Sequence, residues 1–230
     1  MTDTKLDSLA LTVHRVEEAL KPRLRGVLHE AAFAISLVTG TVIVCLTHGA
    51  MATVSVSVYA TAVALLFGTS AAYHRGTWSP RAQSIMSRLD HSMIFVLIAG
   101  TYTPLCLVLL DGWVRWLIFS LVWGGALGGI IARNAARHAP RWIFVTFYLV
   151  LGWIAVAIIP QVLSVGGVAV LVLLLVGGLL YSAGAVVYAR RSPNPSPQWF
   201  GFHEVFHAFT LAAFAAHYVA ISLAVYNAPT

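Results

Sequence analysis

The sequence predicts an all-α, polytopic membrane protein: a seven-transmembrane helix bundle preceded by a short amphipathic N-terminal helix. Apolar residues make up 59% of the 230 residues and charged residues only 10%, and the mean hydropathy is +0.84. This composition is far more apolar than that of a soluble domain. Seven apolar runs approach or exceed the ~20 residues that a helix needs to cross a bilayer. The basic residues gather in alternate connections between these runs, as they do in multi-pass proteins.

Residues 1–24 are the longest stretch outside the apolar runs, and we expect them to form a cytoplasmic amphipathic segment. Apolar residues recur there at alternating three- and four-residue steps, which places them on one stripe of a helix. They are Leu6, Leu9, Val13, Val16 and Leu20. Such a helix would lie on the membrane surface or against the bundle. Asp3 and Asp7 stand where a secretory signal would carry basic residues, so no secretory signal is expected.

The rest of the chain, residues 25–230, is predicted to be a single seven-transmembrane domain. Its apolar runs cover residues 31–50, 53–74, 90–110, 113–133, 142–162, 166–189 and 200–224. Pro104 and Pro160 lie inside runs, where proline kinks a helix or ends it. Cys45 and Cys106 also lie inside runs and are expected to be buried thiols rather than a disulfide or a pair of ligands.

The placement of the basic residues predicts the orientation of the bundle. Five precede the first run, three lie between the second and third, three follow the fourth, and two precede the seventh. Of the fourteen lysines and arginines, only Arg115 lies on the other side. Because basic connections stay in the cytoplasm, we expect a cytoplasmic N-terminus and an outside C-terminus in the cell's inner (plasma) membrane. The same placement accounts for the net charge of +6, so no nucleic-acid partner is expected.

Three histidines give the strongest functional signal, because the predicted topology brings them to the cytoplasmic leaflet. His203 and His207 are four residues apart, so they share one helical face at the start of the last run. His74 ends the second run. Three neutral imidazoles and a water form a common catalytic zinc site. His74, His203 and His207 are therefore the candidate ligands of Zn²⁺.

Two further polar residues are expected at the same depth. Asp90 begins the third run and is a candidate catalytic residue that would hold or deprotonate the water. Ser70 lies one helical turn before His74, where its hydroxyl could bind a water, a substrate carbonyl or an oxyanion. His29 and Glu30 open the first run and could line the mouth of the site.

Each assignment has a structural alternative. The histidines could bond to lipid headgroups or to backbone groups at the membrane surface. Asp90 could pair with Arg88 or cap the third helix, and Ser70 could bond back to its own helix. His91 points about 100° away from Asp90 on a helix, and His217 lies about 15 Å deeper than the histidine pair. Neither is therefore expected to bind the same ion.

Residues 203–207 also read H-E-x-x-H, the metalloprotease motif in which the glutamate, here Glu204, is the general base. An intramembrane protease with this motif needs a further acidic ligand, and Asp111 is the acid that the chain offers. Asp111 falls in a connection on the outer side, most of a membrane thickness away from His203. The protease interpretation therefore fails on geometry.

Several ordered motifs together resemble the hemolysin III family. They are Ser70–His74, Arg88–Ser92, Gly100–Pro104 and the His203-x-x-x-His207 pair, preceded by Arg25–Glu30. The larger group is the progestin and adipoQ receptor superfamily, which includes the adiponectin receptors. The resemblance implies a seven-helix bundle with the N-terminus inside, and zinc bound by three histidines near the cytoplasmic face. It assigns these roles to His74, His203 and His207, a contact with the metal-bound water to Asp90, and the nearby serine to Ser70.

The sequence therefore favours a zinc-dependent integral-membrane hydrolase that cleaves amide or ester bonds of membrane lipids at the cytoplasmic leaflet. A lipid substrate follows from the depth of the site. The alternative is a non-enzymatic membrane-homeostasis or signalling protein in which a structural zinc ion joins the second and seventh spans. A pore-forming hemolysin is disfavoured, because no span shows the regular polar stripe that a water-filled pore requires.

Overall fold

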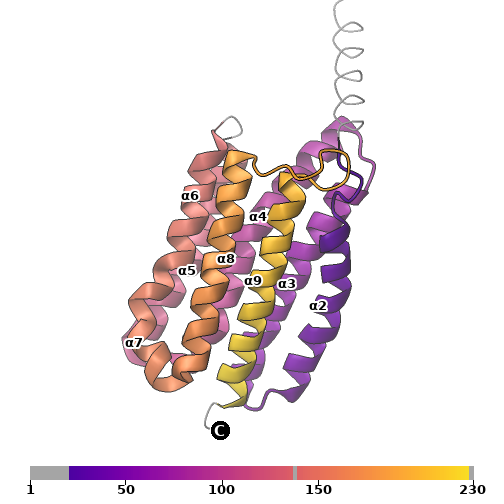
Figure 1. The fold of residues 1–230 in the computed structure, drawn as a ribbon. Coiled ribbons are helices and arrows are strands. Elements are labelled where there is room, and N and C mark those ends of the chain that lie inside the picture. Colours follow the sequence, from indigo (N-terminus) through magenta and orange to yellow (C-terminus); the bar gives the residue numbers. More distant parts are fainter. Residues whose placement is uncertain (1–20, 137–138, 228–230) are drawn as a thin grey trace, which may run out of the picture.

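The computed structural model describes residues 21–136 and 139–227, which form one bundle of long helices (Figure 1). The helices are α2 (Val27–Leu46), α3 (Ala50–Arg75), α4 (Pro80–Pro104), α5 (Gly112–Ala135), α6 (Arg141–Gly152), α7 (Ile159–Gln161), α8 (Gly167–Arg190) and α9 (Phe202–Tyr226). Three irregular helical segments join them: η1 (Leu105–Leu109), η2 (Trp153–Ile158) and η3 (Val162–Gly166). The described part of the chain contains no strand, which confirms the all-α class. The predicted amphipathic helix falls on residues 1–24, of which 1–20 lie outside the described part.

The outer surface of the bundle is apolar. Side chains on its periphery such as Val38, Leu127 and Val168 are 65%, 60% and 66% exposed. An aqueous protein does not expose this much contiguous apolar surface. Six helical stretches in the described residues are long and apolar enough to cross a bilayer. The chain is therefore a multi-pass membrane protein.

The sequence predicts seven spans, and the difference from six stretches lies in Arg141–Arg190. This stretch of 50 residues is one of the six, but it contains three helices, α6, α7 and α8. The chain reverses direction at its lower end, where Gly167 adopts a φ of +81° that a side chain would disfavour. After the reversal α8 packs against α6, as Figure 1 shows.

One end of the bundle, the upper end in Figure 1, gathers the polar features described below. Helices α2, α4, α6 and α9 begin there, and α3, α5 and α8 end there. Ten basic residues of the described chain lie at or near this end: Lys21, Arg23, Arg25, Arg75, Arg81, Arg88, Arg133, Arg141, Arg190 and Arg191. Arg115 begins α5 at the opposite end, so the described basic residues are distributed as the sequence predicts.

Helix α4 begins ten residues earlier than its apolar run. Ser79 caps it, because the Ser79 hydroxyl accepts a hydrogen bond from the Ala82 amide at 3.4 Å and Pro80 occupies the first turn. Asp90 therefore lies inside the helix, almost three turns from its start, and the prediction that it begins the third helix is wrong. Apolarity alone set that boundary too late, because Arg81 and Arg88 lower the hydropathy of turns that are nevertheless helical.

Prolines interrupt the helices where the sequence predicts. Pro104 is the last residue of α4 and is followed by the π-helical segment η1, and Pro160 lies in α7 between η2 and η3. Tyr102 connects α4 to this irregular region, because its hydroxyl donates to the Gly152 carbonyl at 2.6 Å and accepts from the Ala155 amide at 2.5 Å. These two bonds hold α6 and η2 against α4.

Candidate metal centre

Three histidines meet at the upper end of the bundle. One ring nitrogen each from His74, His203 and His207 lies within 4.8 Å of the other two. His74 is the penultimate residue of α3, and His203 and His207 lie in the first two turns of α9. The ring centroids of the α9 pair are 4.5 Å apart, as their four-residue spacing requires. The structure thus joins residues from two distant parts of the sequence into one cluster.

The geometry of the cluster fits a metal ion. The Nε2 atoms of His74 and His203 lie 3.1 Å apart, and two nitrogens that bind one tetrahedral ion at about 2 Å are separated by roughly 3.3 Å. The Nδ1 atom of His207 is buried and has no hydrogen-bond partner among the described residues. Three imidazoles are a donor set that suits zinc and other first-row metals. These residues could therefore hold one such ion.

Asp90 and Ser70 lie next to the histidines. The Asp90 Oδ2 atom is 3.9 Å from His74 Nε2, and the Ser70 hydroxyl lies beside the same carboxylate. The alternatives for Asp90 are not seen, because Arg88 donates to the Ser84 carbonyl and Ser79 caps α4. In the described part of the chain no lysine or arginine forms an ion pair with Asp90. The carboxylate thus faces the cluster without a cationic side chain to neutralise it.

His29 is a fourth imidazole of this region. It lies in the first turn of α2, is only 3% exposed, and stacks on His207 with ring centroids 3.5 Å apart and planes 14° apart. Its edge contacts Phe67, and both of its ring nitrogens are buried without a hydrogen-bond partner among the described residues. The sequence predicts His29 near the mouth of the site. Its stacking on His207 could not be predicted from the spacing of residues along the chain. Glu30, by contrast, is exposed and pairs with Arg75 at 3.0 Å.

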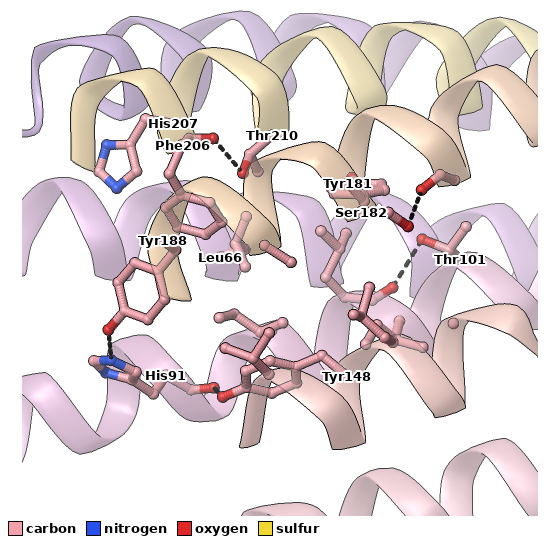
Figure 2. A pocket seen from close by; sticks show the side chains of 18 of the residues that line it. Leu66, His91, Thr101, Tyr148, Tyr181, Ser182, Tyr188, Phe206, His207 and Thr210 are labelled. Carbon is pink, nitrogen blue, oxygen red and sulfur yellow. Dashed lines mark hydrogen bonds between the residues drawn. The ribbon is translucent and has the colours of Figure 1, made fainter. Parts of the chain in front are cut away.

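The other candidate residues do not join the three histidines, although the His91 Nδ1 atom lies 3.9 Å from the Asp90 Oδ2 atom. His91 uses both ring nitrogens, one with the Ser87 carbonyl at 2.6 Å and one with the Tyr188 hydroxyl at 3.0 Å, as Figure 2 shows for Tyr188. His217 bonds to the Leu174 carbonyl at 3.2 Å, well below the cluster. Asp111 pairs with Arg115 at the lower end of the bundle, beside the end of α9. Asp111 therefore cannot supply the acidic ligand that the protease interpretation needs.

Glu204 is engaged by other groups. Its Oε1 atom forms an ion pair with Arg25, and its Oε2 atom accepts a hydrogen bond from the Gly201 amide at 2.8 Å. The side chain is 1% exposed. The sequence left the role of Glu204 open. A buried acid in the first turn of an apolar helix signals a hidden basic partner, but it does not identify which one.

A largely apolar cavity of about 160 Å³ opens from the histidines into the bundle. Ser70, Asp90, His203 and His207 line its upper end, and aliphatic and aromatic side chains line the rest. Figure 2 shows Tyr188 near His91 and His207 at one end of this space and Thr101 at the other, with Phe206 and Leu66 between them. A ligand with a polar group at the histidines and an apolar tail along the helices would match this distribution.

Comparison with known proteins gives a consistent set of relatives. A family model described as "Haemolysin-III related" matches residues 18–218. "Hemolysin-3 homolog" of Bacillus subtilis (strain 168) is 36% identical over 172 residues, which cover 73% of this chain and 76% of the relative. "Hemolysin-3" of Bacillus cereus is 35% identical over 170 residues, which cover 73% of this chain and 74% of the relative. "Monocyte to macrophage differentiation factor" of Homo sapiens is 26% identical over 181 residues, which cover 75% of this chain and 71% of the relative. These matches confirm the predicted resemblance, and the chain belongs to the hemolysin III family.

Proposed function

We propose that this protein is a zinc-dependent integral-membrane hydrolase that cleaves amide or ester bonds of membrane lipids. The observation that carries the proposal is the junction between the His74–His203–His207 cluster and the apolar cavity. Candidate metal ligands, a partly buried carboxylate and an apolar space meet at one point. Such a convergence of ionisable groups inside a membrane bundle supports the hypothesis of a functional site.

Each residue of the site has a proposed role. A zinc ion held by the three histidines would polarise a carbonyl and acidify a water. Asp90 orients that water and takes its proton, because its carboxylate faces the cluster and has no basic partner among the described residues. Ser70 donates a hydrogen bond to the substrate carbonyl or to the developing oxyanion. The cavity excludes water from the acyl tail and so aligns the scissile bond.

We further propose seven membrane crossings, with the N-terminus in the cytoplasm and the C-terminus outside. The reversal at Gly167 supports two crossings within Arg141–Arg190. The ten basic residues at or near the upper end support a cytoplasmic placement of that end in the cell's inner membrane. The histidines would then lie in the cytoplasmic leaflet, where substrate lipids enter sideways between helices.

A second candidate function is a non-enzymatic membrane-homeostasis or signalling protein in which zinc is structural. The origin of the histidines favours it, because they come from two helices and one ion would join α3 to α9. Asp90 separates the candidates. A structural zinc site has a closed coordination sphere and needs no base, so only the hydrolase requires the Asp90 carboxylate.

Release of fatty acid from a panel of amide and ester lipids tests the proposal directly. The assay uses detergent-purified, zinc-loaded protein, with Asp90→Asn as the matched inactive variant. Release by the wild type and its loss in Asp90→Asn, with the same zinc content, would support the hydrolase. Zinc-loaded wild type that releases no fatty acid from any lipid of the panel would contradict it.

A further inference from the structure

The residues that lead into α2 contact both helices that carry the histidines. We infer that residues 22–29, here named the brace, position the three histidines, and that Glu204 is a positioning residue of this brace rather than a catalytic base. The inference rests on the proposed metal site but not on lipid hydrolysis. It assigns a role to the glutamate of the H-E-x-x-H motif, which the proposed reaction does not use.

The first contact of the brace is the ion pair between Arg25 and Glu204. Glu204 lies between His203 and His207 in the sequence and is 1% exposed. One of its carboxylate oxygens faces the Arg25 guanidinium, and the other accepts the Gly201 amide at 2.8 Å. Both oxygens are thus committed. Glu204 caps the start of α9 and ties it to the brace, so it is not free to accept a proton from a water at the cluster.

The second contact is between Gly26 and His74. Gly26 has a φ of +83°, and a Cβ added there would lie 2.6 Å from the Cβ of His74. A glycine is therefore needed for two reasons, the left-handed backbone and the close approach. Adjacent residues of the brace thus touch α9 through Arg25 and α3 through Gly26.

The third contact is the stack of His29 on His207, with centroids 3.5 Å apart. His29 follows Gly26 by one turn of α2, and α2 packs against both α3 and α9. Each of these contacts lies at a candidate ligand or one residue from one. The brace therefore restrains the histidines of α3 and α9 together. The distance between these histidines depends on the position of the brace.

The brace is itself anchored to the segment that precedes α9. The amides of Arg23 and Leu24 donate to the carbonyls of Gln198 and Trp199 at 2.9 and 3.2 Å. The Arg23 guanidinium also lies 4.6 Å from the centre of the Trp199 ring. These bonds fix where Arg25 stands when it meets Glu204, so the brace and the start of α9 form one unit.

Metal affinity of brace variants tests this inference without a lipid assay. Zinc dissociation constants are measured by competition with a chelator in Glu204→Gln, Arg25→Gln and Gly26→Ala, and the absorption spectrum of the Co²⁺ form reports ligand geometry. We expect affinity to fall by about 10- to 100-fold in each variant, as for other residues that orient metal ligands. Asp111→Asn is the matched control, because it removes an exposed ion pair at the opposite end of the bundle and should leave the affinity unchanged.

A charge exchange separates positioning from catalysis. Arg25→Glu combined with Glu204→Arg restores the ion pair, although not the Gly201 cap, and should recover part of the lost affinity. If Glu204→Gln binds zinc as tightly as the wild type, with an unchanged Co²⁺ spectrum, the inference is overturned. Loss of lipid turnover with intact zinc affinity would overturn it too, because Glu204 would then be a base.

The outcomes also separate this inference from the proposed hydrolase. Weakened zinc binding in the variants of a wild type that cleaves no lipid would leave the brace standing and remove the hydrolase. A wild type that binds no zinc would remove both. Arg25→Lys keeps the positive charge, and it replaces Arg25→Gln in the comparison if the neutral variant does not fold.

Discussion

His74 and His203 are separated by 129 positions in the chain, yet their Nε2 atoms lie 3.1 Å apart. The two rings face each other and the ring of His207, and His74 also faces the Asp90 carboxylate. A cation bound between the rings would satisfy all of these groups at once. The predictions below test this arrangement and the cavity that adjoins it.

Asp90→Asn should abolish lipid hydrolysis and preserve metal binding. The amide has almost the shape of the carboxylate but cannot take a proton, and removing a general base costs about 100-fold or more in rate. Zinc content and fatty-acid release are measured on the same preparation. Unchanged release would show that Asp90 is not the base and would favour the structural-zinc alternative.

Replacing His29 should separate the contribution of its stacked ring from that of its ring nitrogens. His29→Phe keeps a ring against His207 and removes two buried nitrogens that have no hydrogen-bond partner among the described residues, so stability should change by less than about 1 kcal/mol. His29→Ala leaves a cavity and should cost roughly 2–4 kcal/mol. Thermal unfolding in detergent compares the two variants. A loss in His29→Phe as large as the loss in His29→Ala would show that the nitrogens, rather than the stacked ring, stabilise this region.

Gly100→Ala should destabilise the packing of α3 against α4. An added Cβ would lie 2.4 Å from the Cβ of Ala62, so the helices must separate. Overpacking of this kind costs about 1–3 kcal/mol. Gly128→Ala on α5 is the control, because nothing lies within 4 Å of its added Cβ. Equal unfolding temperatures for the two variants would contradict the close approach of α3 and α4.

Ala185→Trp should fill the cavity and select against long acyl chains. Ala185 lines the cavity from α8, so the indole would occupy the space proposed for the tail. We expect turnover of long-chain lipids to fall by about tenfold or more, whereas short-chain lipids and zinc content are spared. Leu127→Trp serves as the control, because Leu127 lies on the outer surface of the bundle and is 60% exposed. An equal loss for short and long chains would place the tail elsewhere.

The sequence alone predicts the parts of this molecule that depend on local rules. The four-residue spacing of His203 and His207 sets them on one face of a helix, and the alternation of basic connections brings His74 to the same end. Hydropathy finds each long helix of the described chain, since an apolar run of about 20 residues is typical of a membrane-spanning helix. The grouping of the candidate ligands could therefore be expected, although their chemical roles are proposals.

Other features depend on contacts between distant segments, and sequence patterns do not encode them. The start of α4 follows from the Ser79 cap and not from hydropathy. The stack of His29 on His207 and the pairing of Arg25 with Glu204 arise because α2 lies against α9. A buried acid or imidazole indicates that the side chain has a partner, but which residue is the partner depends on how the helices pack.

Metal content per chain is the most direct test of the central claim. It is measured in detergent-purified wild type and in His207→Ala, each after zinc is supplied and excess is removed. The account predicts about one zinc ion per wild-type chain, as for a single three-histidine site, and its loss in the variant. Wild type that remains free of metal would contradict the metal centre, the hydrolase and the structural-zinc alternative together.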